Sequence, residues 1–581
     1  MIRQYSRFRR TLVLLGVILV ISTIGAAAAL ADGPEVVVAS GSPDSPFAQN
    51  KQNEPWVAID PSDPTHMVAG ANDEIDLEAC AAGDNTTCPF TAGVGVTGVS
   101  FSLDGGTTWV QPDYTGYSAR GCLGPTECVP VVGGPIGTLP WFYEEGLVSD
   151  GDPSMVFGPQ PDGEGTFSWD NGSRLYYATL TSNFSAARDE TTIKGFEAIA
   201  VSRMDDIDAA AIGDKNAWMP PVVASKQSSA TFSDKEAIWA DNAESSPHFG
   251  NVYVCNVAFR SAGGPPEPVV FLRSTDGGDT WSQRQISQAS NTNQASGQAG
   301  GRQGCVVRSD SQGNVYVAWR GTFKGDDVIW LARSTDGGVK FARPQAVAVT
   351  GTVGAFDPVQ GRLTFDGVAG ARTNEGPTMD IANGAPTGAD ATNMIVLGWT
   401  DGLAGLNNET AKLQTSIDGG ATWSTPVTAS ADGDRPDFPW VAISPDGDDV
   451  YVVYMAFLTD WQTDITTNAR TMQGVVRHAD VSDLSSWNEL HRGATGDARG
   501  SSANSLALEF LGDYNYVFAT NDGAMAVWND VRDAASCEAV NEWRQSLVDG
   551  APVPTPAPPT DCPAKFGNSD IFGRYLDDPT P

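Results

Sequence analysis

The segment Ser274-Thr275-Asp276-Gly277-Gly278-Asp279-Thr280-Trp281 decides the fold of this chain. It follows the β-rich run 269–273, and Asp-Gly between two such runs favours a hairpin, because glycine accepts positive φ and Asp bonds nearby backbone amides. The same pattern recurs at 102–109, 334–341 and 416–423. We expect four equivalent structural turns, each followed by a Trp or Phe that packs back over the turn.

A second unit accompanies these turns and occurs seven times. It consists of a polar stretch, a short strand, a turn and a strand that ends in an aromatic residue, and its copies begin at 54, 152, 234, 305, 377, 439 and 512. Six repeats supply four strands each, whereas the seventh supplies three and can be completed by the run 36–39. The sequence therefore predicts an all-β, seven-bladed β-propeller of four-stranded antiparallel blades, with six blades as the alternative. Ring closure of this kind removes exposed sheet edges.

The first residues are typical of a signal peptide. Arg3, Arg7, Arg9 and Arg10 precede the apolar run 12–24, and Ala29-Leu30-Ala31 has the small-x-small pattern of a cleavage site. A retained membrane anchor is the alternative, since 11–31 is long enough to span a bilayer. We expect a signal peptide over 1–31 and a single propeller domain over 32–581. Inserted loops are expected at 111–148 and 184–193, with a helical and Pro-rich excursion at 530–563 in the last blade.

Cysteine content and charge restrict the environment and the partners. Eight cysteines in an exported chain indicate disulfides, and their order favours the local pairs Cys80–Cys88, Cys122–Cys128, Cys255–Cys305 and Cys537–Cys562. The net charge is −36, and removal of the four signal-peptide arginines leaves 31 basic against 71 acidic residues, a net charge of −40. Such a field repels nucleic acid and anionic lipid, so neither is expected as a partner.

The four Asp-Gly turns and the Pro-x-x-Ala-x-Asp pattern of the inner strands resemble the sialidase-like superfamily of bacterial-neuraminidase-repeat proteins, whose turns are called Asp boxes. The resemblance runs from about 50 to 576. It implies three arginines that clamp a sugar carboxylate, a Tyr nucleophile activated by a Glu, and an Asp acid–base. The family's first arginine lies in an Arg-Ile-Pro motif, and the corresponding stretch here is Asn50-Lys-Gln-Asn-Glu-Pro55.

Candidate site residues follow from placement within the repeats. Substrate-binding candidates are Arg302, Arg372 and Arg435, each just before an inner strand in successive repeats, and Lys235 at a nearby position in the preceding repeat. Catalytic candidates are Tyr514 as nucleophile, with Glu375 and Asp73 as carboxylate partners. The alternative is that these polar residues cap strands or line a wet channel.

Three functions stay open at this point: a glycoside hydrolase similar to an exo-sialidase, a non-catalytic propeller that binds an extracellular glycan, peptide or protein, and a structural envelope component. No HExxH, Walker P-loop or GxSxG motif occurs, so no cofactor is expected. The acidic loops 60–63 and 446–449 have the oxygen ligands for a structural calcium ion but not the EF-hand spacing, and solvated turns explain them better. After signal cleavage we expect no membrane contact. The sequence does not indicate an oligomeric state.

Overall fold

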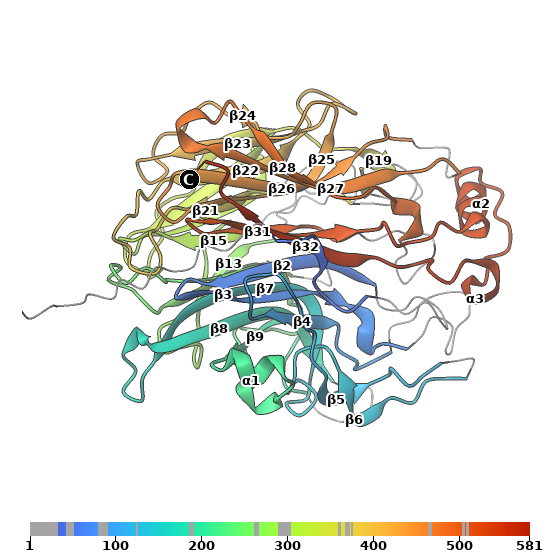
Figure 1. Cartoon of the computed structure of the whole chain (residues 1–581), viewed down its shortest axis with the longest axis horizontal. Helices are drawn as coiled ribbons and strands as arrows, with labels where there is room; N and C mark the ends of the chain where they lie inside the picture. Colours follow the sequence, from blue (N-terminus) through green and yellow to red (C-terminus); the bar gives the residue numbers. More distant parts are fainter. Residues whose placement is uncertain are drawn as a thin grey trace, which may run out of the picture.

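The computed structural model describes residues 33–41, 51–78, 91–123, 126–184, 191–260, 267–288, 304–357, 362–365, 372–373, 376–462, 467–501, 506 and 511–580. Within these residues, seven antiparallel sheets are arranged as blades of one ring, which confirms the predicted seven-bladed all-β propeller (Figure 1). The predicted signal peptide and the cysteine pair 80 and 88 lie outside the described residues.

Each blade is built from consecutive strands, so the chain completes one sheet before starting the next. Blades 1 to 3 are β2(Gln52–Asp60), β3(Asp63–Asp73) and β4(Thr97–Ser102); β7(Leu147–Pro161), β8(Phe167–Asn183), β9(Ala198–Met204) and β10(Trp218–Val223); and β11(Phe232–Ala240), β12(Val252–Phe259), β13(Val269–Ser274) and β14(Ser282–Gln285). Blades 4 and 5 are β15(Val306–Ser309), β16(Val315–Phe323), β17(Asp326–Ser334) and β18(Gln345–Thr350); and β21(Thr378–Ile381), β22(Ile395–Asp401), β23(Thr410–Ser416) and β24(Val427–Thr428). Blade 6 is β25(Arg435–Ile443), β26(Asp449–Phe457), β27(Thr471–Asp480) and β28(Asn488–Arg492), with β29(Gly496–Asp497) also paired to β27.

Blade 7 closes the ring with strands from both ends of the chain. It contains β30(Tyr516–Ala519), β31(Gly523–Asp530) and β32(Asp570–Asp577), and β1(Val36–Val37) pairs with β32 as its outermost strand. The predicted closure by the run 36–39 is therefore confirmed. Blade 1 differs slightly from expectation, because its fourth strand is reduced to a single bridge between Phe101 and Val110.

The four Ser-x-Asp-Gly-Gly segments form the same outer hairpin turn. In the copy at 274–281, Asp276 accepts hydrogen bonds from Thr280 N (3.0 Å) and from the hydroxyls of Thr280 (2.5 Å) and Ser274 (2.7 Å). Trp281 Nε1 donates to the carbonyl of Gly278 at 3.1 Å, so the indole packs back over the turn as predicted. These Asp side chains therefore stabilise the turn by accepting hydrogen bonds from its amide and hydroxyl groups.

The insertions lie together at one end of the ring axis, on the right in Figure 1. The segment predicted as a polar loop at 111–148 carries the hairpin β5(Tyr114–Ser118) and β6(Val131–Ile136). The predicted helical excursion contains α2(Glu538–Val548) and α3(Pro558–Asp561), and the pair β19(Ala355–Asp357) and β20(Arg362–Thr364) lies at the same end. We call this end the top face, and the opposite end, which carries the Asp-Gly turns, the bottom face. The short helix α1(Ile207–Ala211) interrupts blade 2 between β9 and β10.

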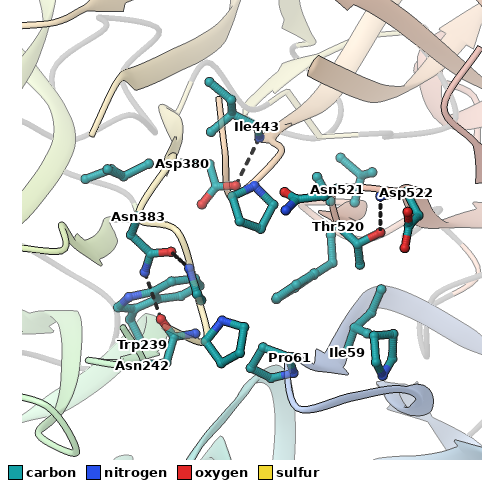
Figure 2. A pocket seen from close by; sticks show the side chains of 18 of the residues that line it. Ile59, Pro61, Trp239, Asn242, Asp380, Asn383, Ile443, Thr520, Asn521 and Asp522 are labelled. Carbon is teal, nitrogen blue, oxygen red and sulfur yellow. Dashed lines mark hydrogen bonds between the residues drawn. The ribbon is translucent and has the colours of Figure 1, made fainter. Parts of the chain in front are cut away.

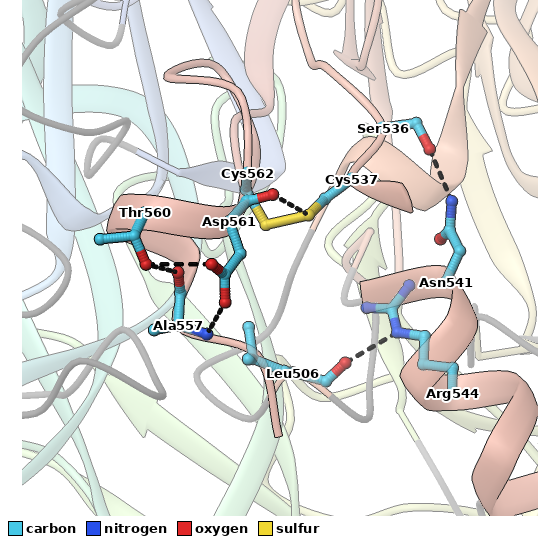
Figure 3. Close-up of a disulfide and its surroundings, with 9 residues drawn as sticks. All are labelled: Leu506, Ser536, Cys537, Asn541, Arg544, Ala557, Thr560, Asp561 and Cys562. Atoms are coloured by element: carbon cyan, nitrogen blue, oxygen red, sulfur yellow. Dashed lines mark hydrogen bonds between the residues drawn. A yellow bond between two sulfur atoms is a disulfide. The ribbon is translucent and has the colours of Figure 1, made fainter. Parts of the chain in front are cut away.

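Three of the four predicted disulfides fall within the described residues and are confirmed: Cys122–Cys128, Cys255–Cys305 and Cys537–Cys562. The last joins the start of α2 to the end of α3 (Figure 3). Near it, Arg544 Nε of α2 donates a hydrogen bond to the carbonyl of Leu506 at 2.7 Å. No helix of the described residues is long and apolar enough to cross a membrane.

An aromatic plug fills the middle of the central channel. Trp56 of blade 1 stacks on Tyr516 of blade 7 with ring centroids 3.9 Å apart, and meets Trp440 of blade 6 edge-on at 4.8 Å. Arg308 of blade 4 lies 4.2 Å over the ring of Trp239 and donates to Tyr516 Oη at 2.9 Å. These buried side chains separate a top cavity from a bottom cavity.

Candidate functional site

The inner strands of four blades carry the same two-residue bulge just before they enter the plug. The pairing register shifts in blades 1, 2, 3 and 6, and the first bulged residue has a left-handed backbone in each: Glu54 (φ 55°), Asp152 (φ 53°), Lys235 (φ 57°) and Phe438 (φ 52°). Such a conformation costs a non-glycine residue about 1–3 kcal/mol and is concentrated at functional sites. Bulges also re-aim side chains, and here they turn three charged groups toward one point on the top face.

These charged groups form what we call the central cluster: Glu54, Asp152, Lys235, Arg372 and Asp513. Lys235 Nζ lies 3.0 Å from Asp152 Oδ2 and 3.6 Å from Glu54 Oε1, and it also pairs with Asp513. Arg372 Nε lies 3.1 Å from Asp513 Oδ1. Blades 1, 2, 3 and 7 and the segment before blade 5 therefore all contribute to one ionic network, and both of its cations are paired with carboxylates.

Within the cluster, the carboxyl groups of Glu54 and Asp152 lie close enough to shift one another's pKa. Burial and the charge of Asp152 raise the pKa of Glu54 well above its usual range. Burial alone would also raise the pKa of Asp152, but Lys235 and the hydrogen bond from Glu54 lower it to about 2. The pKa of Glu54 is thus raised while that of Asp152 is lowered, as expected for two like charges at close range.

A small central cavity of about 60 Å³ lies directly above the plug, between Lys235, Trp56, Trp440 and Tyr514. Glu236, the second bulged residue of blade 3, lines it, and neither of its carboxyl oxygens has a hydrogen-bond partner among the described residues. Burial, followed by the charge of Asp152, raises the pKa of Glu236 well above its usual range. The volume admits one substituent of a ligand and is too small for a whole sugar ring.

A larger space, which we call the outer cavity, lies beside blade 2 on the top face. Its volume is about 510 Å³, within the range of roughly 300–1,000 Å³ of small-molecule sites. Its walls are Thr91, Ala92, Gly93, Val94, Val96, Val148, Asp150, Leu180, Ser182, Asn183, Glu197 and Phe232. Carboxyl, amide and hydroxyl groups thus face the same space as an aromatic ring.

Asp150 and Glu197 form a second carboxyl pair in the outer cavity. A side-chain hydrogen bond joins them, and the buried Asp150 Oδ2 and Glu197 Oε1 have no further hydrogen-bond partner in the described part of the chain. Burial, followed by the charge of Asp150, raises the pKa of Glu197 to about 11, whereas burial raises that of Asp150 to about 6. At neutral pH, Glu197 therefore holds the proton.

Asp234 lies between the two regions in sequence, after Phe232 of the outer cavity and directly before Lys235 of the central cluster. It lies two residues after Phe232 on β11, so its side chain leaves the strand on the same side as that ring. Burial raises the pKa of Asp234 to about 6 against the opposing charge of Lys235. The charges of Asp234 and Asp152 both contribute to the high pKa of Glu197, so an acidic residue of the central cluster influences protonation in the outer cavity.

Three of the residues predicted from the sequence come together here: Lys235 and Tyr514 line the central cavity, and Arg372 pairs with Asp513, which also lines it. The Tyr514 hydroxyl donates to the carbonyl of Pro153 at 3.0 Å, and burial, followed by the charge of Glu54, raises its pKa well above the usual range. In this arrangement the Tyr514 phenol is neutral and hydrogen-bonded.

Two others lie in different surroundings. Arg435 pairs with Glu409 at 3.0 Å and donates to the carbonyls of Thr459 and Phe365, so it ties blades 5 and 6 together. Asp73 accepts from Ile75 N at 3.0 Å, where it caps a short 3-10 turn, and from Gln111 Nε2 at 2.7 Å. The remaining two candidates, Arg302 and Glu375, lie outside the described residues.

The acidic loops considered for calcium are internally bonded turns. Asp60 accepts from Ser62 N at 2.8 Å, and Asp446 accepts from the Ser444 hydroxyl at 2.6 Å. The channel also opens on the bottom face, where a cavity of about 160 Å³ lies below the plug (Figure 2). There Asn383 donates to Asn242 at 2.8 Å and Asp380 accepts from Ile443 N at 3.1 Å. These lining groups are bonded to one another, in contrast to the unsatisfied carboxyl oxygens of the top face.

Sequence reasoning missed Glu54, Asp152, Asp150 and Glu197. A signal for the first two was available, because Glu54-Pro55 and Asp152-Pro153 place a charged residue and a proline inside an inner strand. Proline is tolerated in sheets mainly at edges and bulges, so it marks a bulge in such a strand. Asp150 and Glu197 carry no comparable local signal.

Comparison with known proteins gives structural matches at low sequence identity. No protein-family model and no curated protein sequence matches it. Among solved structures it is similar to a Trypanosoma rangeli sialidase (12% identity, TM-score 0.38, covering 71% of this chain and 54% of that one) and to the phage phi92 endosialidase (10%, 0.40, 94% and 69%). It is also similar to a Penicillium chrysogenum α-L-arabinanase (17%, 0.31, 53% and 76%). The chain thus spans about half the length of the trypanosomal sialidase, and its likeness to sialidases is a distant one of propeller fold.

Proposed function

We propose that this chain is an exported glycoside hydrolase that acts on a neutral glycan bound in the outer cavity. One observation carries the proposal: Asp150 and Glu197 are joined by a hydrogen bond in a cavity of ligand size, and the buried Asp150 Oδ2 and Glu197 Oε1 have no further hydrogen-bond partner among the described residues. A buried unsatisfied polar group costs about 1–3 kcal/mol. Hydroxyl groups of a bound sugar would remove that cost.

The three acids of this region take different roles. Glu197 keeps its proton at neutral pH and would donate it to the oxygen of the leaving sugar. Asp234 is ionised above a pKa of about 6 and would supply the second carboxylate that glycoside hydrolysis requires. Asp150 is too close to Glu197 to flank a glycosidic bond with it, so we assign it a positioning role, in which it holds Glu197 protonated.

The charge of the top face favours a neutral sugar over a sialic acid. The central cluster has no cation to spare, because Lys235 faces Glu54, Asp152 and Asp513, and Arg372 faces Asp513. A substrate carboxylate would have to displace one of these partners within a chain of net charge −36. A neutral glycan meets no such barrier.

Export is part of the proposal and rests on the cysteines. The described residues contain three disulfides. Disulfide bonds persist in oxidising compartments and are rare in the cytosol. They agree with the signal peptide expected at 1–31.

The test is a panel of neutral aryl glycosides, including arabinofuranosides, galactosides and glucosides, with an aryl sialoside beside them. We expect the purified chain to hydrolyse at least one neutral glycoside faster than the sialoside, and Glu197→Gln to abolish that rate. Asp241→Asn is the matched control, because Asp241 is a buried carboxyl with a pKa raised to about 7, on blade 3 but at the bottom face. The control should keep the wild-type rate. A folded wild-type chain that cleaves only the sialoside, or none of the panel, overturns the proposal.

A non-catalytic glycan-binding propeller is the second candidate. It is favoured by the central cavity, where the Tyr514 hydroxyl is already engaged by the Pro153 carbonyl and both cations are paired. Saturable glycan binding without turnover, weakened equally by Glu197→Gln and Asp150→Asn, would support this candidate instead.

A further inference from the structure

A second group of potential ligand side chains lies on the bottom face, where blade 6 meets blade 7. Asp449 begins β26, His478 lies near the end of β27, and Asp578 directly follows β32. His478 Nε2 is 2.7 Å from Asp449 Oδ1 and 3.9 Å from Asp578 Oδ1, and the three ligand atoms all lie within 4.8 Å of one another. All three side chains are largely buried, that of His478 completely.

The surroundings of this group are strongly acidic. Asp449 and Asp480 are direct cross-strand partners on β26 and β27, an arrangement that is unfavourable for two like charges. Asp446 and Asp448 lie in the turn directly before Asp449 and add two more carboxylates to this region. Within the described ranges, neither lysine nor arginine forms an ion pair with these acids. The region therefore lacks a compensating cation.

An unsatisfied hydroxyl lies beside this group. Tyr451 is fully buried and is the cross-strand partner of His478, with ring centroids 5.1 Å apart. Its Oη has no hydrogen-bond partner among the described residues, although it lies in the field of Asp449 and Asp578. A water molecule held by a cation between these carboxylates would supply the missing partner.

We propose that Asp449, His478 and Asp578 bind a divalent transition-metal ion, Zn²⁺ or Mn²⁺. One imidazole and two carboxylates form a mixed N/O set, which such ions accept, whereas Ca²⁺ takes oxygen ligands. Ligand atoms about 2.1 Å from a tetrahedral ion lie about 3.4 Å from one another. The observed separations of 2.7 and 3.9 Å bracket this value, so small side-chain rotations complete the site.

The position gives the ion a structural task. Asp449 and His478 belong to blade 6, whereas Asp578 follows the last strand of blade 7. A metal ion at this point joins the bottom rims of the two blades, at the end of β32 opposite its start beside the α2–α3 excursion. The proposal is independent of the glycoside hydrolase activity, which we place on the top face.

The test is isothermal titration of the EDTA-treated, full-length chain with ZnCl₂, MnCl₂ and CaCl₂ at pH 7.5, together with thermal unfolding. We expect one Zn²⁺ or Mn²⁺ per chain and a raised Tm. His478→Gln and Asp578→Asn should each weaken binding at least tenfold. Asp578→Asn lies after the last strand and serves if His478→Gln does not fold.

The matched control is His491→Gln. His491 also contacts a carboxylate, Glu35, but Arg574 donates to its other ring nitrogen at 3.0 Å, so a cation is disfavoured there. This variant should bind the metal with unchanged affinity and stoichiometry. The proposal is overturned if neither Zn²⁺ nor Mn²⁺ binds, if only Ca²⁺ binds, or if both site variants bind as tightly as the wild type.

Discussion

Lys235 Nζ lies 3.0 Å from Asp152 Oδ2, and both residues occupy left-handed bulge positions on the inner strands of neighbouring blades. The contact combines two costs, burial of charge and backbone strain, at one point. The blade 6 bulge has Phe438 at the same position, so the ring geometry itself does not require a charged residue there. We therefore interpret the central cluster as part of a functional surface.

Two replacements of Lys235 distinguish the contribution of its charge to stability from the cost of its left-handed backbone. Lys235→Ala leaves Asp152 and Asp513 without their shared cation and should lower the free energy of unfolding by about 3–5 kcal/mol. Lys235→Gly loses the same charge but accepts φ 57° without strain, so it should be about 1 kcal/mol more stable than Lys235→Ala. Urea titrations of the three proteins measure both differences. Equal stability of the two variants would show that the bulge stores no strain.

The Glu197 proton makes stability depend on pH. The folded chain holds this proton up to a pKa of about 11, whereas the unfolded chain releases it near the ordinary glutamate pKa of 4.5, so stability falls as pH rises between these values. Glu197→Gln removes this loss. The Tm of the variant relative to wild type should therefore increase from pH 5 to pH 9, as followed by thermal unfolding. A Tm difference that is constant over this range contradicts a raised pKa of Glu197.

Activity should have a different pH dependence. Asp234 must be ionised and Glu197 protonated, with pKa values of about 6 and about 11. The rate of neutral glycoside hydrolysis should rise with pH to a plateau around a midpoint near 6, and should stay on the plateau through pH 9. Asp234→Asn should remove both the rate and the acidic limb. A bell-shaped profile that declines before pH 8 would point to a different acid.

The Asp-Gly turns should differ in how much they contribute to the free energy of unfolding. Asp276 accepts from Thr280 through both its amide and its hydroxyl, whereas Asp336 accepts from the Lys340 amide and from Ser334. Asp276→Ala should therefore destabilise the chain more than Asp336→Ala, by roughly one hydrogen bond or ~1 kcal/mol. Chemical denaturation of both variants tests the difference. Glycoside hydrolysis should be unchanged in both, because the turns lie on the bottom face.

The Cys537–Cys562 disulfide should stabilise the fold mainly by lowering the conformational entropy of the unfolded chain. It spans a sequence separation of 25 residues, so replacing both cysteines by Ala should cost roughly 3 kcal/mol of stability. The same double replacement at Cys122–Cys128, with a separation of 6, closes a shorter loop and should cost less. Denaturant titrations rank the two variants. The reverse order would contradict a stabilisation that grows with the length of the loop closed in the unfolded chain.

Local sequence signals account for the parts of the fold that were predicted. Asp-Gly turns, alternating strands and closely spaced cysteines act over a few residues, so the blades, the closing strand 36–39 and three disulfides followed from the sequence. The hairpin β5–β6 was missed because its strands are short and rich in glycine.

The candidate site was harder, because it depends on contacts between blades. Arg372 precedes an inner strand and Arg435 begins one, yet Arg435 pairs with Glu409 from a loop of the preceding blade, which the repeat pattern does not reveal. Bulges added a second difficulty, since they turn Glu54, Asp152 and Lys235 out of the regular strand alternation. Asp150 and Glu197 meet only because the β7 and β9 strands start at the same rim of blade 2.

The most direct test of the central claim is the rate of neutral glycoside hydrolysis at pH 7 by Glu197→Gln, relative to wild type and Asp241→Asn, with all three shown to be folded by circular dichroism. Loss of a positioned general acid typically lowers a rate by roughly 10²–10⁴-fold. We predict a decrease of at least 100-fold for Glu197→Gln and a wild-type rate for Asp241→Asn. A Glu197→Gln rate within twofold of wild type would contradict the account.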